Sequence, residues 1–328
     1  MRLITYEIET QFGLNIRIGV LENECVIDLN QAYKALFSGE QDSVFTNNMA
    51  NLLFPTDMIC FFRSGEIGLQ TAREIIKKIK ETKLCKIQAG QRFIYNASDV
   101  RILAPVLRPN TIRDFSTFEQ HQIKVTLQKS GAVVPDVWYE MPVYWKANPD
   151  NTIGPGADIL WPGYTERLDY ELEFGIYIAK MGKNISVEKA HEYIAGYTIF
   201  NDVSARDHQE KEMVMTYGPA KGKDFDNSKV FGPCIVTPDE FEDKSHAMIA
   251  RINGEEWSRS STDQMYWTFA QMIAYASQSE TLMPGDFLAS GTCPTGTGIE
   301  INRWIQPGDV IELEVEGIGI LKNKVIRQ

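Results

Sequence analysis

The sequence predicts a strand-rich α+β protein in which a small N-terminal domain precedes a larger domain built mostly of strands. Three observations lead to this fold class: short apolar runs open the chain, one amphipathic helical stretch follows, and strand patterns dominate from about residue 106 onward. The 328 residues, 43% of them hydrophobic, can bury one large core or two smaller ones. We place the division near residue 105, which gives domains of residues 1–105 and 106–328.

The N-terminal domain is expected to combine a small sheet with one helix. Short apolar or alternating runs, separated by glycine and asparagine, predict strands at residues 2–8, 15–20, 25–29 and 93–95. A helix is expected after Ser64, where apolar residues recur at helical spacing at Leu69, Ala72, Ile76 and Ile79. The stretch 103–110 holds two prolines in an extended pattern and marks the domain boundary.

The clearest strand of the larger domain covers residues 169–179. Its even positions are all apolar or aromatic, whereas Glu171 and Glu173 occupy odd positions. Because successive side chains of a strand point to opposite faces, the even positions should face a core and the two carboxylates should project side by side from the other face.

The next elements follow from caps and turns. Ser186 is expected to cap a helix that runs to about Ala195 and ends at Gly196, and a strand over residues 197–203 would carry Asp202 at its end. Two Pro-Gly-Asp turns, at residues 284–286 and 307–309, each lead into another strand-like run.

Composition excludes several classes of function. A formal net charge of −11 and a pI near 5.0 make nucleic acids and anionic membrane surfaces poor partners, because both repel an acidic surface. We expect a cytoplasmic protein, since the chain has neither an apolar leader pattern nor a stretch of roughly 18 apolar residues. Five scattered cysteines without a Cys-x-x-Cys pair argue for reduced thiols and against a disulfide framework or a structural zinc site.

Glu171 and Glu173 have two interpretations. They form either a solvated polar strand face or part of a cation site, and hard cations such as Mg²⁺ and Ca²⁺ require several oxygen ligands. Asp202 is the candidate third carboxylate, although its spacing in the sequence does not prove that the three converge.

The segment Ser204-Ala205-Arg206-Asp207 also has two interpretations. It matches a capping box, in which Ser204 and Asp207 simply begin a helix. On that helix, however, Arg206 and Gln209 would share a face beside Asp202, which favours binding of an oxygen-bearing ligand.

Two glycine-rich segments follow. Residues 217–226, which contain Lys221 and Lys223, form either a solvated connection or a lid that carries a cation. We reject a phosphate-binding loop at residues 291–298, because it lacks the G-K-[ST] ending and is followed by Ile299-Glu300-Ile301, which is typical of a strand.

Only four histidines occur, and His121 has the most suggestive context, seven residues after Asp114. A lone histidine is more often a packing or surface residue than a base. The residues by themselves therefore predict a carboxylate-rich enzyme that holds a cation.

Taken together, four motifs resemble the fumarylacetoacetate hydrolase family over roughly residues 106–328: D-Y-E-L-E at 169–173, G-Y-T-I-F-N-D-V-S-A-R-D-H-Q at 196–209, G-K-D-F at 222–225 and P-G-D-F-L-A-S-G-T at 284–292. The resemblance implies a mixed β-roll catalytic domain, usually in a homodimer. It also implies a divalent cation, Mg²⁺ first with Ca²⁺ or Mn²⁺ as alternatives, held by Asp114, Glu171, Glu173 and Asp202.

The same resemblance assigns roles in catalysis and substrate binding. Catalytic roles fall on Arg206, Gln209, Lys223, His121 and Glu300, with His121 as the base that activates water and Glu300 as the residue that orients it. Substrate contacts fall on Tyr217, Thr292 and Ser116. The sequence departs from the family pattern in three places: Ser116 replaces a tyrosine, Lys124 replaces a glutamate of shorter members, and a substrate-binding arginine has no counterpart near Lys129 and Ser130.

These roles imply hydrolysis of a carbon–carbon bond in a small β-dicarbonyl acid, similar to fumarylacetoacetate or an acylpyruvate. Two alternatives stay open. One is decarboxylation, tautomerisation or dehydration through a metal-bound enolate, which requires no hydrolytic water. The other is a non-catalytic binding protein that kept the fold, since a fold does not determine a function.

Overall fold

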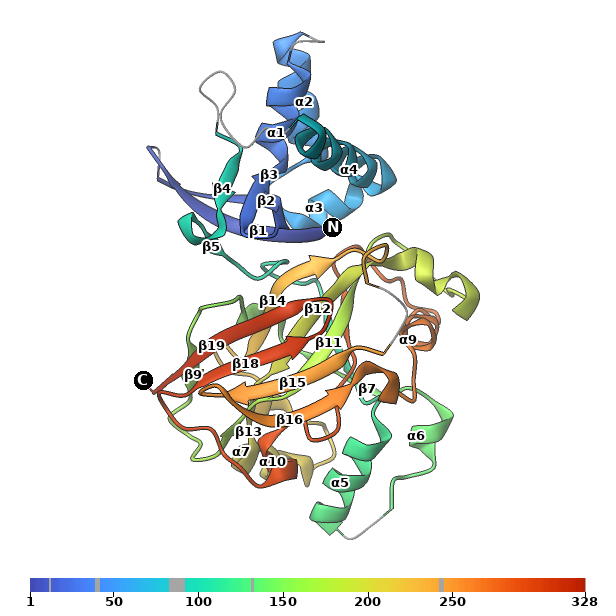
Figure 1. Cartoon of the computed structure of the whole chain (residues 1–328). Helices are drawn as coiled ribbons and strands as arrows, with labels where there is room; N and C mark the ends of the chain where they lie inside the picture. The colour runs from blue at the N-terminus through green and yellow to red at the C-terminus, as the bar shows by residue number, and fades with distance from the viewer. Residues whose placement is uncertain (12, 39–41, 83–91, 131–132, 242–244, 328) are drawn as a thin grey trace.

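The computed structural model describes the whole chain except residues 12, 39–41, 83–91, 131–132, 242–244 and 328. A small N-terminal part lies at the top of Figure 1 and a larger strand-rich part lies below it. This mixture of sheets and segregated helices confirms the expected α+β class.

The N-terminal part is a small antiparallel sheet with helices gathered beside it (Figure 1). Its strands are β1 (Arg2–Thr10), β2 (Gly13–Glu22), β3 (Cys25–Asp28), β4 (Ile94–Asn96) and β5 (Arg101–Ile102). Its helices are α1 (Leu29–Phe37), α2 (Ser43–Leu53), α3 (Met58–Arg63) and α4 (Gly65–Thr82). Aspartates cap the first three of these helices by accepting backbone N–H groups, and α4 is the predicted amphipathic helix.

One mixed sheet continues from the N-terminal part into the larger part, in the order β4-β3-β2-β1-β14-β12-β11-β17-β6-β7. The larger part contributes β6 (Ile112–Phe115), β7 (Tyr144–Ala147), β11 (Leu172–Ile178), β12 (Ile194–Asp202), β14 (Lys229–Val236) and β17 (Phe287–Ala289). The connection is β1 with β14, where Leu3 pairs with Ile235. β17 runs parallel to β6, which makes the sheet mixed as expected.

A second sheet packs in the larger part in the order β16-β15-β18-β19-β9. Its strands are β9 (Ile159–Trp161), β15 (Ala247–Ile252), β16 (Glu255–Ser261), β18 (Val310–Val315) and β19 (Gly319–Arg327). The short strands β8 (Thr152–Ile153), β10 (Leu168–Asp169) and β13 (Ser204–Ala205) complete the set, with β10 paired to β13.

Helices and short 3₁₀ turns border the sheets of the larger part. The helices are α5 (Glu119–Ser130), α6 (Val137–Glu140), α7 (Arg206–Met213), α8 (Ala220–Lys223), α9 (Phe269–Ala276) and α10 (Gly298–Ile301). The 3₁₀ turns along the chain are η1 (Ala97–Asp99), η2 (Pro149–Asn151), η3 (Val187–Tyr193) and η4 (Thr262–Gln264). Helices α5, α7 and α10 lie at one end of the sheets, the lower end in Figure 1.

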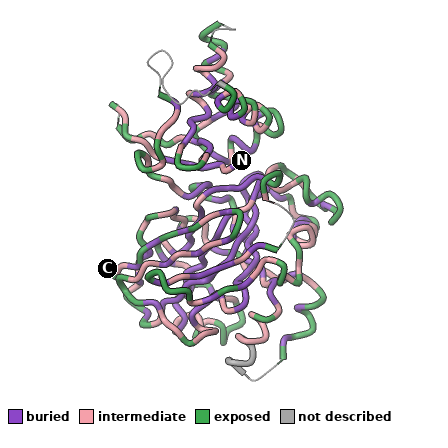
Figure 2. Tube along the Cα trace, viewed as in Figure 1, coloured by how far each residue is buried: buried purple, intermediate pink, exposed green. Residues whose placement is uncertain are grey.

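Buried residues follow the sheets (Figure 2). One core cluster contains Leu3 and Ile75 of the N-terminal part together with Phe200 and Phe231 of the larger part. Because sheet and core both continue across residue 105, the domain division at that position stays a prediction.

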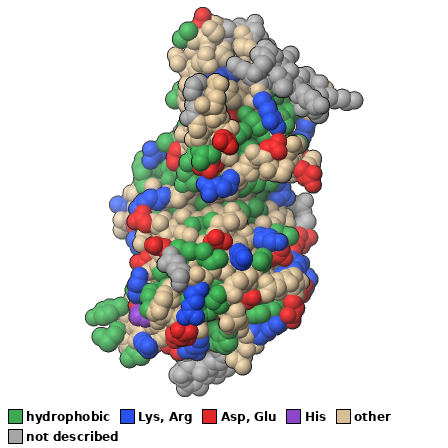
Figure 3. Space-filling model, turned by 90° about the vertical axis from the view of Figure 1, so that its left-hand side faces the viewer, with side chains coloured by type: hydrophobic (Ala, Val, Ile, Leu, Met, Phe, Trp, Pro, Cys, Tyr) green, Lys and Arg blue, Asp and Glu red, His purple; other side chains and the backbone are tan. Residues whose placement is uncertain are grey.

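Three features expected from the composition can be compared with the structure: the surface charges, the cysteines and the absence of a membrane span. On the face shown in Figure 3, basic and acidic side chains are interspersed rather than gathered into a field of one sign. Among the residues placed by the structure, Cys25, Cys60, Cys234 and Cys293 are free thiols, and Cys85 lies outside the described residues. No helix within the described part of the chain is long and apolar enough to span a membrane.

Three local expectations were wrong. The segment after Ser186 forms the seven-residue 3₁₀ helix η3 without a side-chain cap from Ser186, and β12 already begins at Ile194, so Gly196 lies inside a strand. Ser204 is not a capping residue: its hydroxyl donates to the Asp202 carbonyl, and α7 begins at Arg206 without a side-chain cap. Ile299–Ile301 belongs to the helical turn α10 rather than to a strand.

Candidate metal centre and active site

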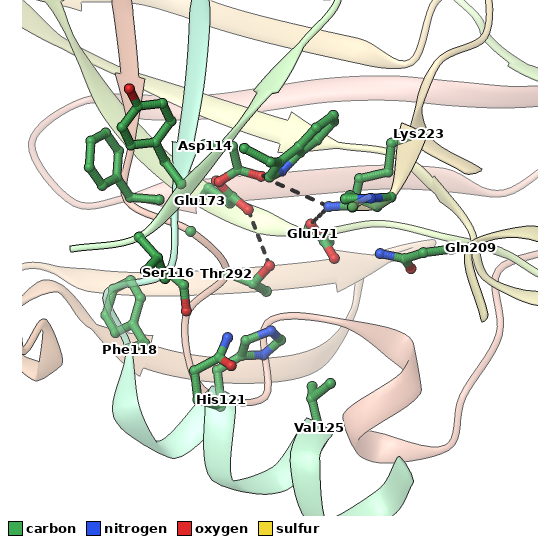
Figure 4. Close-up of a pocket in the computed structure, with 18 of the residues that line it drawn as sticks. Asp114, Ser116, Phe118, His121, Val125, Glu171, Glu173, Gln209, Lys223 and Thr292 are labelled. Atoms are coloured by element: carbon green, nitrogen blue, oxygen red, sulfur yellow. Dashed lines mark hydrogen bonds and ion pairs between the residues drawn. The ribbon is translucent and has the colours of Figure 1, made fainter. Parts of the chain in front are cut away.

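Three carboxylates converge at the base of a cavity. Asp114 comes from β6, Glu173 from β11, and Glu171 from the residue just before β11. One oxygen of each lies within 4.8 Å of the others, and all three residues are buried. Figure 4 shows the three side chains directed toward one another. The strand alternation that predicted a shared face for Glu171 and Glu173 therefore describes this site correctly.

Two oxygens of this group have no hydrogen-bond partner among the described residues. Asp114 Oδ2 accepts a hydrogen bond from Trp145 Nε1 at 2.8 Å and Glu173 Oε1 accepts one from Thr292 Oγ1 at 3.1 Å, but Asp114 Oδ1 and Glu173 Oε2 are buried and unpaired. Burial raises the pKa of Asp114 to about 7, and burial together with Asp114 raises the pKa of Glu173 well above its ordinary value. Clustered carboxylates with unpaired oxygens fit a divalent cation, which would remove their mutual repulsion.

Lys223 connects this group to Asp202. Its ammonium donates to Glu171 Oε2 and to Asp202 Oδ2, each at 2.5 Å, and lies 3.9 Å from Asp114 Oδ2. Asp202 Oδ1 accepts from Lys229 Nζ at 2.5 Å. Asp202 is thus not part of the three-carboxylate group, but it contacts the same Lys223 ammonium group as Glu171 does. The Lys223 ammonium marks the point at which Asp114, Glu171 and Asp202 meet.

Arg206 lies at the start of α7 and is held by several acceptors. Its guanidinium donates to Asp169 Oδ2 at 2.8 Å, to Thr297 Oγ1 at 2.6 Å and to Gln209 Oε1 at 2.9 Å, and it lies 2.7 Å from Glu171 Oε1. Burial acts to raise the pKa of Glu171, but Lys223 and Arg206 more than offset it, so this pKa lies below its ordinary value. Glu171 is therefore an anion in this site.

His121 lies in α5 and is directed toward the cavity (Figure 4). Its Nδ1 is 3.3 Å from Oε2 of Glu300, whose side chain is fully buried. Neither Glu300 oxygen accepts a hydrogen bond from a residue that the structure describes. The structure thus brings together the two residues expected to form a pair, at contact distance and without hydrogen-bond geometry.

A cavity of about 500 Å³ opens above the carboxylates, large enough for a small organic acid. Most of the predicted site residues line it, namely Asp114, Ser116, His121, Glu171, Glu173, Arg206, Gln209, Lys223 and Thr292. Asp202, Glu300 and Tyr217 are not among the lining residues, and Tyr217 is 87% exposed. The Ser116 hydroxyl accepts a hydrogen bond from Trp138 Nε1 at 3.0 Å.

The segment that carries Lys223 is anchored at several points. Glu212 of α7 accepts backbone hydrogen bonds from Lys221 at 2.8 Å and from Gly222 at 2.7 Å. A Cβ atom at Gly222 would lie 2.7 Å from the Cα of Gln209, so glycine permits α8 to approach α7 this closely. At its other end, Asp224 accepts a hydrogen bond from Asn148 at 2.9 Å. The predicted loop is therefore partly helical and fixed to its surroundings.

Sequence reasoning missed four residues of this site. Asp169 accepts hydrogen bonds from Arg206, Thr297 and the backbone of Gly298, and it is fully buried. Trp145, Lys229 and Glu212 likewise contact the residues that were expected. Only Asp169 left a signal in the sequence, as the first letter of D-Y-E-L-E. The side chains of Lys129 and Ser130 lie outside the described residues.

Comparison with known proteins places the chain in a family. The sequence profile described as "Fumarylacetoacetate (FAA) hydrolase C-terminal" matches residues 110–326. The chain belongs to the fumarylacetoacetate hydrolase family. Within this family it is 31% identical to rat "Oxaloacetate tautomerase Fahd2a, mitochondrial" over 305 residues, which cover 91% of this chain and 88% of the relative.

Solved structures agree with the family's fold. A fumarylacetoacetate hydrolase from the psychrophile Exiguobacterium antarcticum matches with a TM-score of 0.69 and 25% identity, covering 99% of this chain and all of the other. A 5-carboxymethyl-2-hydroxymuconate delta-isomerase from Mycobacterium smegmatis matches with a TM-score of 0.66 and 24% identity, covering both chains completely. The expected β-roll fold of the fumarylacetoacetate hydrolase type is confirmed, and enzymes of different activities share it.

Proposed function

We propose that this protein is a divalent-cation-dependent enzyme that interconverts the keto and enol forms of a small 2-oxo dicarboxylic acid similar to oxaloacetate. The observation that carries the proposal is the convergence of Asp114, Glu171 and Glu173 at the base of a cavity, with His121 on its wall. The relationship to an oxaloacetate tautomerase along most of the chain supports this choice over hydrolysis.

The carboxylates define what cation the site would hold. Asp114, Glu171 and Glu173 would bind it, with Asp202 as the fourth ligand because its Oδ2 shares the Lys223 ammonium with Glu171. A ligand set made only of oxygen favours Mg²⁺, with Mn²⁺ or Ca²⁺ as alternatives. When bound, such a cation polarises a carbonyl oxygen and stabilises enolate charge.

The residues of the chain supply the proton transfer and the orientation. His121 removes a proton from the carbon between the two carbonyl groups of the keto form, and the imidazolium so formed gives a proton to the 2-oxo oxygen, directly or through water, so that atoms and charge balance. Gln209 gives its amide oxygen to Arg206, which leaves its NH₂ group to donate to substrate. Ser116 and Thr292 line the same cavity and are proposed to bind the substrate oxygens, whereas Tyr217 can do so only if its segment moves.

Hydrolysis of a carbon–carbon bond is the second candidate, and the closeness of His121 and Glu300 favours it. A histidine next to a buried carboxylate can take a proton from water, which adds to the carbonyl before the bond to the neighbouring carbon breaks. Glu300 would orient the imidazole and stabilise the imidazolium. The distance of 3.3 Å lies just outside good hydrogen-bond geometry, which a bound substrate would have to improve.

Product analysis separates these reactions. The purified protein with Mg²⁺ is offered enol oxaloacetate and a panel of acylpyruvates, and loss of enol absorbance is followed together with pyruvate and carbon dioxide. Tautomerisation removes the enol signal without either product, decarboxylation releases carbon dioxide, and hydrolysis releases pyruvate from the acylpyruvates. Mg²⁺ alone and the His121→Ala protein are the controls. No turnover of any substrate would instead support a binding protein.

Two further properties of this protein, its oligomeric state and its location in the cell, are also proposals. We propose a homodimer, for which light scattering should give twice the chain mass of 37.2 kDa. A cytoplasmic location stays a prediction that cell fractionation tests, and the rat relative carries the word mitochondrial in its name.

A further inference from the structure

A second cavity, of about 190 Å³, lies in the N-terminal part of the chain. It is enclosed by β2, by α1 and by the end of α2, which lie together in Figure 1. Its polar lining residues are Asn15, Arg17, Asn30, Gln31, Lys34 and Asn51, with Thr56 at one edge. None of these belongs to the site that holds the three carboxylates.

The charge of this cavity is opposite to that of the chain. Arg17 and Lys34 line it, and no carboxylate does, although the sequence contains 44 acidic residues and a net charge of −11. Burial and the charge of Arg17 both lower the pKa of Lys34, as expected for two cations held near each other. Two cations in a hollow with no lining anion are a suitable environment for an oxyanion. The amide NH₂ groups of Asn15 and Asn30 already donate within the protein, so the two cations are the donors that matter here.

A structural role of Arg17 is the competing explanation. Its Nη1 donates to Oδ2 of Asp28 at 3.2 Å, and Asp28 is fully buried, also accepting from the Tyr6 hydroxyl and the Gln31 backbone. That pairing uses one of the five guanidinium N–H groups, and within the described residues no other hydrogen bond of the Arg17 side chain occurs. Asp28 carries one negative charge against two cations. Lys34 lies in the last turn of α1, where a cation suits the helix dipole, but it forms no ion pair with a carboxylate of the described residues.

Lys34 itself has only a weak partner. Its ammonium lies 3.5 Å from Asn51 Oδ1, at the outer limit of a hydrogen bond. The same oxygen accepts from Asn30 at 3.1 Å, so the Asn51 NH₂ group is left to face a ligand. Lys34 and Asn51 therefore offer donors without an acceptor of matching charge.

Backbone groups add to these donors. β2 pairs with β3 only from Gly19 to Glu22, so the segment from Asn15 to Ile18 has no neighbouring strand on that side among the residues the structure describes. The nine-residue helix α1 begins at Leu29 beside this open edge, but the Asp28 carboxylate already caps its N-terminus by accepting from the Gln31 N–H, so only the strand edge adds backbone donors.

We propose that this cavity binds a small oxyanion, a phosphate or the carboxylate of a short organic acid, through Arg17 and Lys34. The volume of 190 Å³ corresponds to roughly six water molecules, which suits phosphate or a three-carbon dicarboxylate and excludes a nucleotide. The site is separate from the carboxylate centre, so the proposal does not depend on the reaction that the centre catalyses.

Titration calorimetry of the metal-free protein with inorganic phosphate, and separately with malonate, tests this at constant ionic strength. We expect saturable binding that Lys34→Gln weakens roughly 10- to 100-fold, because one charge-assisted hydrogen bond is lost. Arg17→Gln should weaken it similarly. Lys34→Gln is the decisive variant, since Lys34 does not hold Asp28 and its loss should leave the thermal unfolding temperature nearly unchanged.

Arg101→Gln is the matched control. Arg101 is an exposed cation of the same N-terminal part that lies 2.8 Å from Glu7, outside this cavity, so its loss removes one positive charge without touching the site. Retained affinity in this variant supports a specific site. Failure of the unmodified protein to bind either anion at millimolar concentration, or an equal loss in Arg101→Gln, would overturn the proposal.

Discussion

Three buried carboxylates, those of Asp114, Glu171 and Asp202, lie around the Lys223 ammonium, which is the only cation that contacts both Glu171 and Asp202 among the described ion pairs. If a divalent metal ion binds close to the position of this ammonium group, Asp114→Asn and Asp202→Asn should each lower Mg²⁺ affinity by at least about 10-fold. Lys223→Met should leave that affinity unchanged or higher, because a competing positive charge is removed. Calorimetry with Mg²⁺ and Mn²⁺ on the three variants measures this. Unchanged affinity in Asp202→Asn would remove Asp202 from the ligand set.

His121 and Glu300 make a second prediction at the scale of single residues. General-base assistance contributes about 10²- to 10⁴-fold, so His121→Ala should lower turnover on that scale while Mg²⁺ affinity stays nearly the same. Glu300→Gln should lower turnover less. If the two residues act as a unit, the double variant should lose less than the two single losses combined. Steady-state rates of enol loss provide the measurement, and near-normal turnover of His121→Ala would reject the histidine as the base.

At the scale of single residues, the sequence predicted which side chains share a face of one strand better than it predicted which side chains of different strands come into contact. Alternation along one strand placed Glu171 and Glu173 on a shared face, because the period of a strand depends only on local geometry. The approach of Asp114 depends on the pairing of β6 with β17, which joins positions far apart in the chain. No local pattern contains that register. Lys229 was missed for the same reason, since it contacts Asp202 only after the strands assemble.

At the scale of elements, α8 depends on Glu212 for its position. Glu212 accepts from two consecutive backbone N–H groups at the start of the segment that carries Lys223. Glu212→Ala should therefore release this segment and lower kcat by roughly 10-fold, in line with the loss of one or two hydrogen bonds to a charged acceptor. Mg²⁺ affinity should stay nearly unchanged, and Glu212→Gln should recover part of the rate. Parallel rate and calorimetry measurements test this.

Glu192→Ala is the matched control for that change. Glu192 pairs with Lys180 at 3.0 Å on the surface of the molecule and contacts no residue of the site. It should retain full activity. A Glu212→Ala protein that turns over substrate as fast as Glu192→Ala would show that α8 keeps its position without this carboxylate.

Other elements show where local patterns mislead. The segment after Ser186 has a cap residue, polar positions and a following glycine, yet it forms a seven-residue 3₁₀ helix that ends before Ala195, because β12 begins at Ile194. Strand pairing of β12 with both β11 and β14 outweighs helix propensity there. Residues 299–301 alternate as a strand does, but Gly298 and Ile299 donate to Asp169 and hold the turn α10 in place.

At the scale of the whole molecule, a bound cation should raise stability. It would bind only the folded arrangement of carboxylates, which adds about 2.7 kcal/mol to the free energy of unfolding at 100 times the dissociation constant. An increase of a few degrees in the unfolding temperature with Mg²⁺, reversed by EDTA, is therefore expected from calorimetry. Asp114→Asn should not respond. Equal responses of the two proteins would mean that Mg²⁺ acts elsewhere.

The pairing of β1 with β14 has a consequence for any attempt to work with fragments. Leu3 of β1 pairs with Ile235 at the edge of β14, and Ile4 and Tyr6 pack into the core of the larger part. A fragment that begins at residue 106 would present β14 as a bare edge next to uncovered apolar side chains. Such edges are templates for pairing between chains, so this fragment should form insoluble aggregates even though it contains the carboxylate centre.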